Sequence, residues 1–165
     1  MTLRWSTKLL AFSVILVSIT GCGGGILFVD RLPSGTPRGY VSFEIQESWK
    51  LGVNHSISIS EFDKDASNAY QKDLYQYQAT IWAGRTGFDP TAHSKAKIAA
   101  APGPHRYGIS GCGSETRNVD VPVAEGMVVP VIIDLTMVSY SPGPVTRVGY
   151  TCSTSVGQAV PDPKK

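Results

Sequence analysis

Apolar and polar residues alternate along most of the chain beyond residue 25, and a period of two predicts β-strands with one buried face. The pattern is plainest over residues 40–46 and 127–140, where branched or aromatic side chains face one way and polar ones the other. It predicts further strands over residues 26–29, 53–62, 74–83, 95–101, 105–110, 119–123 and 145–154. Gly- and Pro-containing turns separate these segments, and there is hardly a helical period. Seven to nine short strands predict an all-β fold, an antiparallel immunoglobulin-like β-sandwich, with an open or closed barrel as the alternative.

The alternation also predicts which side chains are buried. His55 shares a face with Ile57 and Ile59, which indicates a core histidine. Pro130 and Asp134 lie opposite the aliphatic residues of their strand, so one side of it is expected to face solvent or an edge. In the segment 74–83, one face is formed by Tyr75, Tyr77, Ala79 and Ile81.

The first 21 residues have the features of a secretory signal. A short basic head with Arg4 and Lys8 precedes an apolar run that begins at residue 9 and ends in small residues. The run is about 14 residues long, shorter than the roughly 20 that a helix needs to span a bilayer. A cleaved signal is therefore favoured over a transmembrane anchor with an incidental cysteine.

The apolar run ends in Ile19-Thr20-Gly21-Cys22, and this order resembles the lipobox of bacterial lipoproteins. The resemblance implies that Cys22 receives a diacylglyceryl group on sulfur, that residues 1–21 are cleaved off, and that the new amine is acylated. In that family an aspartate after the cysteine often retains the protein in the inner membrane. Here the position is Gly23, so the resemblance implies an outer-membrane lipoprotein facing the periplasm if the source is Gram-negative.

Cleavage changes the charge balance of the chain. The 15 Lys and Arg residues lose Arg4 and Lys8, which leaves 13 against 13 Asp and Glu. A neutral mature domain does not support a nucleic-acid partner. Its length suits one domain. We expect the lipidated cysteine and a tether over 22–39, the β-sandwich over 40–157 and a flexible tail over 158–165.

Two further cysteines, Cys112 and Cys152, remain after Cys22 is lipidated. The space beyond the inner membrane is oxidising, so we expect a disulfide between them, with two unpaired thiols as the alternative. Small residues flank both cysteines and would let the two backbones approach. Neither cysteine belongs to a CxxC pair or has a histidine at ligand spacing, so a metal site is less favoured.

Candidate catalytic chemistry is sparse. His55, His93 and His105 are the only histidines, and no two are close in sequence. A base–nucleophile pair of His105 and Cys112 would need a free thiol, which the expected disulfide removes. No nucleophile elbow and no zinc-protease motif occurs in the chain. We therefore expect no catalytic residue, no cofactor and no metal.

Two groups of residues, one acidic and one aromatic, could serve as binding sites. Glu61, Asp63, Asp65 and Asp73 could supply oxygen ligands to calcium, but lysines interrupt them and the calcium-loop pattern is missing, which favours a solvated loop. Tyr75, Tyr77 and Trp82 alternate with glutamines, and such a strand can stack on sugars or bind protein. The competing interpretation places these tyrosines in the core.

Residues 95–138 resemble the β-sandwich modules of PEGA type and related lipoprotein domains. The matching positions are turn residues: Pro102, Gly103, His105, Glu125 and Gly126. The resemblance implies an immunoglobulin-like scaffold at a cell envelope, without catalytic residues.

From these observations we expect a lipid-anchored, non-catalytic envelope protein. It would act as a structural or protein-interaction module with a protein partner of an envelope assembly. The alternative is a lipoprotein that binds a small ligand or a glycan through the strand with Tyr75, Tyr77 and Trp82.

Overall fold

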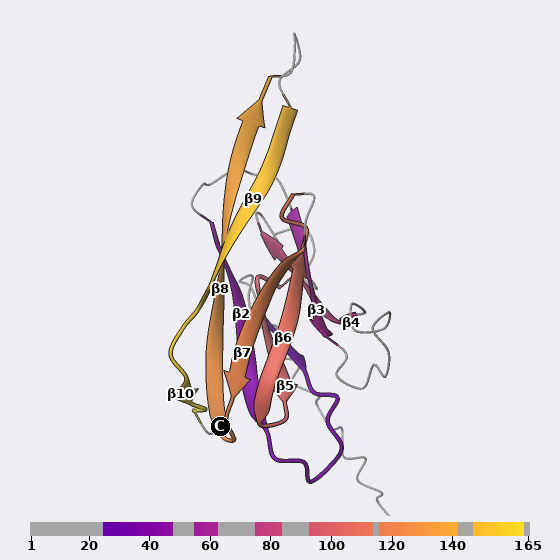
Figure 1. Ribbon diagram of the computed structural model, residues 1–165, viewed down its shortest axis with the longest axis vertical. Helices are drawn as coiled ribbons and strands as arrows, with labels where there is room; N and C mark the ends of the chain where they lie inside the picture. Colours follow the sequence, from indigo (N-terminus) through magenta and orange to yellow (C-terminus); the bar gives the residue numbers. More distant parts are fainter. Residues whose placement is uncertain are drawn as a thin grey trace, which may run out of the picture.

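Ten β-strands in two packed sheets make up the described part of the chain (Figure 1). The computed structural model describes residues 25–47, 55–62, 75–83, 93–113, 116–141 and 147–163. The first sheet has the order β1 (Ile26–Val29), β5 (Lys95–Ala100), β2 (Gly39–Glu47), β8 (Met127–Tyr140), and both β9 (Arg147–Val156) and β10 (Val160–Pro161) pair with β8. The second sheet has the order β4 (Tyr75–Ala83), β3 (His55–Phe62), β6 (Gly103–Ser110), β7 (Arg117–Val123).

The predicted all-β sandwich is confirmed, and its pairing adds detail that the alternation could not supply. Two pairings are parallel, β1 with β5 and β2 with β8. Between β2 and β8 the chain builds all four strands of the second sheet and adds β5 to one side of β2. It then returns in β8 on the other side of β2, running in the same direction, so the pair β2–β8 is parallel. β8 therefore lies inside its sheet, and its Pro130 and Asp134 side chains lie on the face opposite the core.

Short turns in this fold do not always make hairpins. β5 and β6 are separated by Ala101 and Pro102 alone, yet β5 pairs with β1 and β2 while β6 pairs with β3 and β7. The turn thus carries the chain from one sheet to the other. True hairpins join β3 to β4, β6 to β7 and β8 to β9.

The core lies between the inner faces of the two sheets. Alternate residues of β2 and β8, such as Phe43, Val131 and Ile133, meet the inner residues of β3 and β6. The Phe43 ring packs edge-on against the Tyr107 ring, with centroids 5.2 Å apart. Aromatic pairs favour this geometry because the positive edge of one ring meets the negative face of the other.

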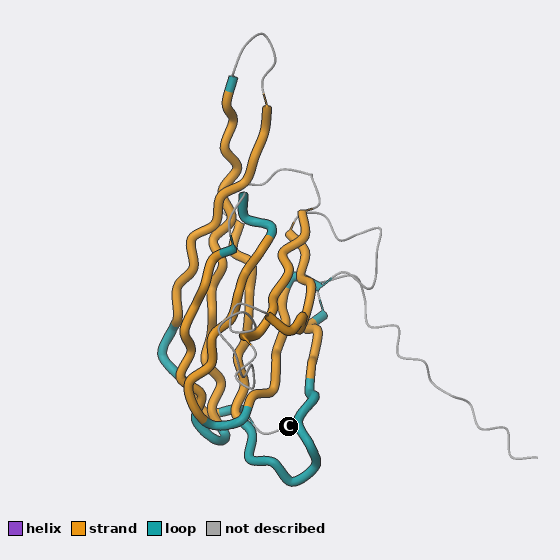
Figure 2. Tube along the Cα trace, turned by 45° about the vertical axis from the view of Figure 1, so that its right-hand side comes forward, coloured by secondary structure: helices purple, strands orange, loops and turns teal. Residues whose placement is uncertain are grey.

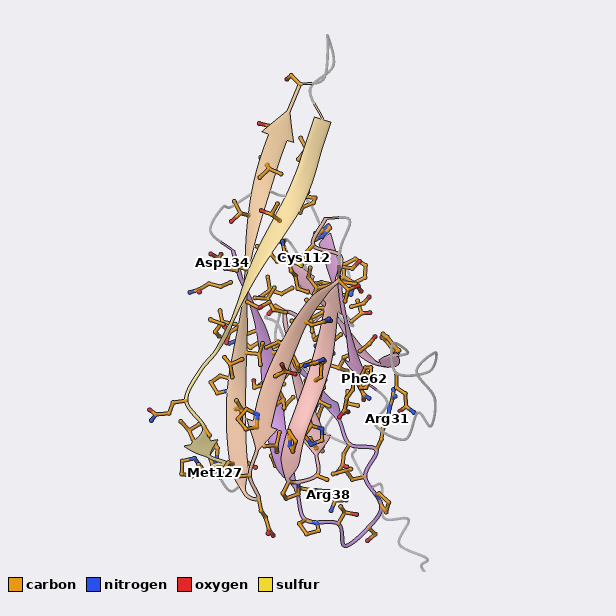
Figure 3. All side chains as sticks on the ribbon, in the orientation of Figure 1. Arg31, Arg38, Phe62, Cys112, Met127 and Asp134 are labelled. Atoms are coloured by element: carbon orange, nitrogen blue, oxygen red, sulfur yellow. A yellow bond between two sulfur atoms is a disulfide. The ribbon has the colours of Figure 1, made fainter. Side chains whose placement is uncertain are left out.

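The connection between β1 and β2 is held together by Arg38, and it lies at the end of the sandwich where Figure 3 labels this residue. We call it the Arg38 loop. The Arg38 guanidinium donates to the Asp30 carboxylate (3.0 Å) and to the Thr36 and Pro33 carbonyls (2.7 and 3.0 Å). At Gly39 a Cβ atom would lie 2.2 Å from the Ala124 carbonyl oxygen, so only glycine fits there. The connection between β1 and β2 is therefore tied to the body.

Both ends of the predicted sandwich extend further than residues 40–157. β1 lies in the segment that the sequence suggested as tether, and its four residues pair with β5. β10 lies in the segment expected to be a flexible tail, and it pairs with the start of β8. Just beyond β10, the Asp162 amide donates to the Gly126 carbonyl (2.8 Å), and its carboxylate pairs with Lys97 (2.5 Å).

The β8–β9 hairpin projects beyond the rest of the sandwich, at the end opposite the Arg38 loop (Figures 1 and 2). The two strands remain in register from Val131↔Val156 to Tyr140↔Arg147. The strands of the second sheet end below the tip, so none of the described strands covers either face of the outer half of the hairpin.

Candidate functional site

The proposed lipidation site, Cys22, lies outside the described residues, as do the signal and the lipobox. Within the described residues, the structure contains no helix of the length and apolarity needed to cross a membrane. The described chain begins at Gly25, immediately before β1.

The disulfide between Cys112 and Cys152 is confirmed. The two Sγ atoms are 1.98 Å apart and the Cα atoms 5.2 Å apart, and both residues are buried. Cys112 belongs to the connection between β6 and β7, and Cys152 to β9, so the bond joins the second sheet to the first. Figure 3 labels Cys112 near the base of the projecting hairpin.

His55 lies beside this disulfide and contacts both the β6–β7 connection and β9. Its Nε2 atom contacts the Gly111 carbonyl, which can only accept, so Nε2 carries the hydrogen. The His55 ring stacks on the Tyr150 ring of β9, with centroids 4.2 Å apart. At Gly111 φ is +102° and a Cβ would lie 2.5 Å from the Ser56 carbonyl oxygen. His55, predicted as a core histidine, is half-buried and helps to hold the base of the hairpin.

His105 forms a second polar contact inside the sandwich. Its Nδ1 lies 2.5 Å from a Glu61 carboxylate oxygen, and its Nε2 lies 2.7 Å from the Ala101 carbonyl. Because that carbonyl only accepts, Nε2 donates to it, and Nδ1 faces the Glu61 carboxylate. These contacts make His105 a packed and hydrogen-bonded residue of the sandwich. A free Cys112 thiol for a catalytic pair is absent, because the disulfide uses it.

Of the acidic cluster suggested for calcium, Glu61 alone lies within the described residues, and it pairs with His105. Asp63, Asp65 and Asp73 lie outside them. Among the residues that the structure describes, no three His, Cys, Asp or Glu side chains are placed to hold a metal ion.

A β-bulge reverses the alternation within β4. Ile59 pairs with Ala79 but Ser60 pairs with Tyr77, so Gln78 has no counterpart on β3. The extra residue turns Gln78 inward, where it is buried and its amide lies 3.5 Å from Glu61, and turns Tyr77 outward to 55% exposure. The prediction that Tyr77 shares a core face with Ala79 and Ile81 is therefore wrong, because a bulge shifts the period of two by one residue.

Tyr77 and Trp82 consequently lie on one surface, the outer face of the second sheet. The Tyr77 hydroxyl donates to the Thr80 hydroxyl (3.2 Å), which holds the ring along the strand. Ser58 pairs with Thr80 on one side and with Ser110 on the other, so small hydroxyl side chains continue the surface. Tyr75 opens β4, but its side chain lies outside what the structure describes.

The outward edge of β4 is partly covered. Arg31 donates to the Tyr77 carbonyl (2.7 Å), and the Trp82 amide donates to the His93 carbonyl (2.8 Å). β7, the opposite edge of this sheet, carries Pro122 and the exposed Arg106–Asp120 ion pair with β6, and both features discourage strand addition. The hydrogen bond from Arg106 lowers the pKa of Asp120.

The β9 edge of the first sheet is different. Over residues 147–156 it bears no proline and one charged residue, Arg147, and within the described part of the chain no strand pairs with its outer side. Near its outer end Val148 is 54% exposed, and Val138 of β8 is 38% exposed. Sequence alternation predicted the strands of this hairpin but not that it would project.

Comparison of the chain with protein-family models, with curated proteins and with solved structures finds no match. What the structure itself shows, over its described residues, is an all-β sandwich with a disulfide between Cys112 and Cys152.

Proposed function

We propose that this chain is a lipid-anchored, non-catalytic lipoprotein of the bacterial cell envelope that acts as a protein-interaction or structural module of an envelope assembly. The lipobox around Cys22 supports the anchor, and the neutral mature charge supports a protein partner over nucleic acid. The Gly23 position favours the outer membrane, facing the periplasm.

The projecting β8–β9 hairpin is the observation that carries the proposal. Long unpaired strand edges are templates for pairing with another chain, and folds that do not use them blunt them with charge or proline. β9 is not blunted in this way, and exposed valines lie on both faces of the hairpin, Val148 on β9 and Val138 on β8. The disulfide and the His55–Tyr150 stack hold the base of the hairpin, which lowers the entropy cost of presenting it.

Purification from detergent-solubilised envelopes tests the proposal. Wild-type protein is expected to retain a stable partner, and Val138→Asp with Val148→Asp is expected to lose it. Val160→Asp is the matched control, because Val160 is 50% exposed on β10, at the opposite end of β8. Equal retention by the hairpin variant and the control would contradict the role of the hairpin.

Glycan or small-ligand binding is the second candidate, and the bulge in β4 favours it. An exposed tyrosine beside Thr80, with Trp82 on the same face and serines alongside, provides rings for stacking and hydroxyls for hydrogen bonds. A glycan array with wild type, Tyr77→Ala and Trp82→Ala distinguishes this candidate. Signals that both substitutions abolish would favour it over the interaction module.

A further inference from the structure

The strand closest to the proposed anchor has an unusual apolar outer side. In β1, Leu27 and Val29 pack against the core, while Ile26 and Phe28 on the opposite face are 58% and 55% exposed. The inward-facing residues of β1 already attach this edge strand to the core, so the two exposed apolar side chains on its outer face contribute little to folding. Exposed apolar residues grouped in this way indicate a contact surface.

Aromatic and lysine side chains continue this surface across the first sheet. The Phe28 ring lies 6.0 Å from the Tyr40 ring, and the Lys97 ammonium lies 4.3 Å from the centroid of Tyr40. In the register of the sheet, Ile26 pairs with Lys95 and Phe28 with Lys97. The two ammonium groups also form ion pairs, with the Glu44 and Asp162 carboxylates respectively. Aromatic rings with long lysine stems beside them suit the boundary between lipid headgroups and acyl chains, where one end of the side chain is dry and the other wet. We call Ile26, Phe28 and Tyr40 the β1 face.

The chain that precedes β1 is too short to hold this surface far from the proposed anchor. A Cβ atom at Gly25 would lie 3.1 Å from His93 Nδ1, so Gly25 itself lies beside the body of the sandwich. Successive Cα atoms are at most about 3.8 Å apart, so Cys22 lies within about 11 Å of Gly25 and about 15 Å of Ile26. A lipid on Cys22 would therefore hold β1 at the membrane surface.

We propose that the β1 face rests in the interfacial layer of the phospholipid bilayer to which Cys22 is anchored. This inference rests on the proposed lipid anchor. Since Ile26 and Phe28 project from the outer face of the first sheet, that face turns toward the bilayer. The long axis then lies along the membrane, and the β8–β9 hairpin reaches sideways toward a partner in the same membrane.

Fluorescence quenching tests the proposal. The full chain, expressed with its signal and processed, is reconstituted into phosphatidylcholine–phosphatidylglycerol vesicles with or without lipids brominated near the headgroup end of the acyl chains. Phe28→Trp reports on the β1 face, and Val148→Trp, similarly exposed on β9, is the matched control. Emission of the native tryptophans is subtracted with wild-type protein. Because interfacial side chains enter about 5–10 Å into the headgroup–acyl boundary, we expect brominated lipid to reduce emission at position 28 about twofold and to leave position 148 unchanged.

A second variant distinguishes insertion of the β1 face into the lipid layer from mere proximity of this face to the bilayer. Ile26→Ser in the Phe28→Trp background should weaken the quenching while leaving the melting temperature unchanged, because Ile26 is exposed. Quenching at position 28 no greater than at position 148 overturns the inference. So does a blue-shifted emission without bromine quenching, which would indicate a second copy or another protein on this face.

Intact mass of the reconstituted protein distinguishes the two proposals. A lipidated Cys22 with no quenching at position 28 rejects the docking of the β1 face alone. An unlipidated mature chain rejects the anchor and the docking with it.

Discussion

Single buried polar groups mark where the interior of this sandwich departs from a purely apolar core. Tyr107 is fully buried, and among the described residues its hydroxyl has no hydrogen-bond partner. Burial raises the pKa of Tyr107 well above its ordinary value, and the Glu61 carboxylate adds to the rise. Both effects favour the neutral phenol, because an anion would lose its hydration and face a nearby negative charge.

Tyr107→Phe is expected to leave stability at neutral pH unchanged or to raise it by about 1 kcal/mol, since the lost hydroxyl is not paired. Above the ordinary tyrosine pKa of 10.0, the unfolded chain releases a proton that the folded chain keeps. The unfolded state then binds fewer protons, so wild-type stability falls as pH rises past that value. Urea unfolding at neutral pH and above pH 10.0 measures both effects, and the variant should lose less stability on alkalinisation than wild type does. Equal alkaline losses would contradict the assignment to Tyr107.

The His105–Glu61 contact is the second residue-scale feature. His105→Leu leaves the part-buried Glu61 carboxylate and the Ala101 carbonyl without this donor. We expect the free energy of unfolding to fall by about 1–3 kcal/mol, the cost of leaving a buried polar group unsatisfied. Arg106→Ala, next in sequence, is the control: its ion pair with Asp120 is exposed and screened by solvent, so its loss should change the free energy of unfolding little. Similar losses in both variants would mean that the His105 contact contributes little.

At the scale of the element, β4 shows how one inserted residue moves the side chains that precede it to the opposite face of the strand. Ile81 and Tyr77 are four positions apart and would share a face in a regular strand, yet the bulge at Gln78 separates them. Tyr77→Ala should therefore change stability by no more than about 0.5 kcal/mol. Ile81→Ala should cost about 2–5 kcal/mol, because Ile81 is fully buried. Thermal or urea unfolding of the pair measures this, and a large loss for Tyr77→Ala would restore the core interpretation.

The projecting hairpin is the other element whose stability depends on a local feature. Replacing both Cys112 and Cys152 by Ala removes the bond that joins its base to the second sheet. Losing a native disulfide from a small secreted domain typically costs about 2–5 kcal/mol, so the melting temperature should fall. Alkylation of denatured protein without reductant gives an independent measurement: neither cysteine should react, and labelling of both would show that the bond does not form in the native protein.

For the whole molecule, the proposed membrane attachment depends on Cys22. Cys22→Ser removes the sulfur that would carry the diacylglyceryl group, so the variant should accumulate unprocessed or be released from the membrane fraction. A protein held by one acyl chain alone binds a bilayer only marginally, so two or three chains are expected on the wild type. Intact mass spectrometry of membrane-extracted wild-type protein decides the matter. A mature N-terminus without lipid would contradict the anchor.

The positions of the strands along the chain, and the buried face of each regular strand, could be predicted from the sequence because alternation is a local property. β8 begins and ends at the predicted residues, and the alternating valines of β7 all face inward, as their spacing indicates. The pairing of Cys112 with Cys152 could be expected from the sequence on the premise that Cys22 is lipidated, since the chain has no further cysteine. The buried face of a regular strand follows from its own residues.

Features that depend on contacts between distant segments were decided by the tertiary structure. The turn at Pro102 looks the same in sequence whether the next strand joins the same sheet or the opposite one, and only the packing of β6 against β3 sends it across. The outward turn of Tyr77 depends on the register of β3, which no pattern within β4 encodes. The projection of β8–β9 depends on where β3 and β6 end, because a hairpin is covered only as far as the opposing sheet extends. Local alternation determined the strands of this protein, whereas long-range pairing determined which of their faces and edges remain open for binding.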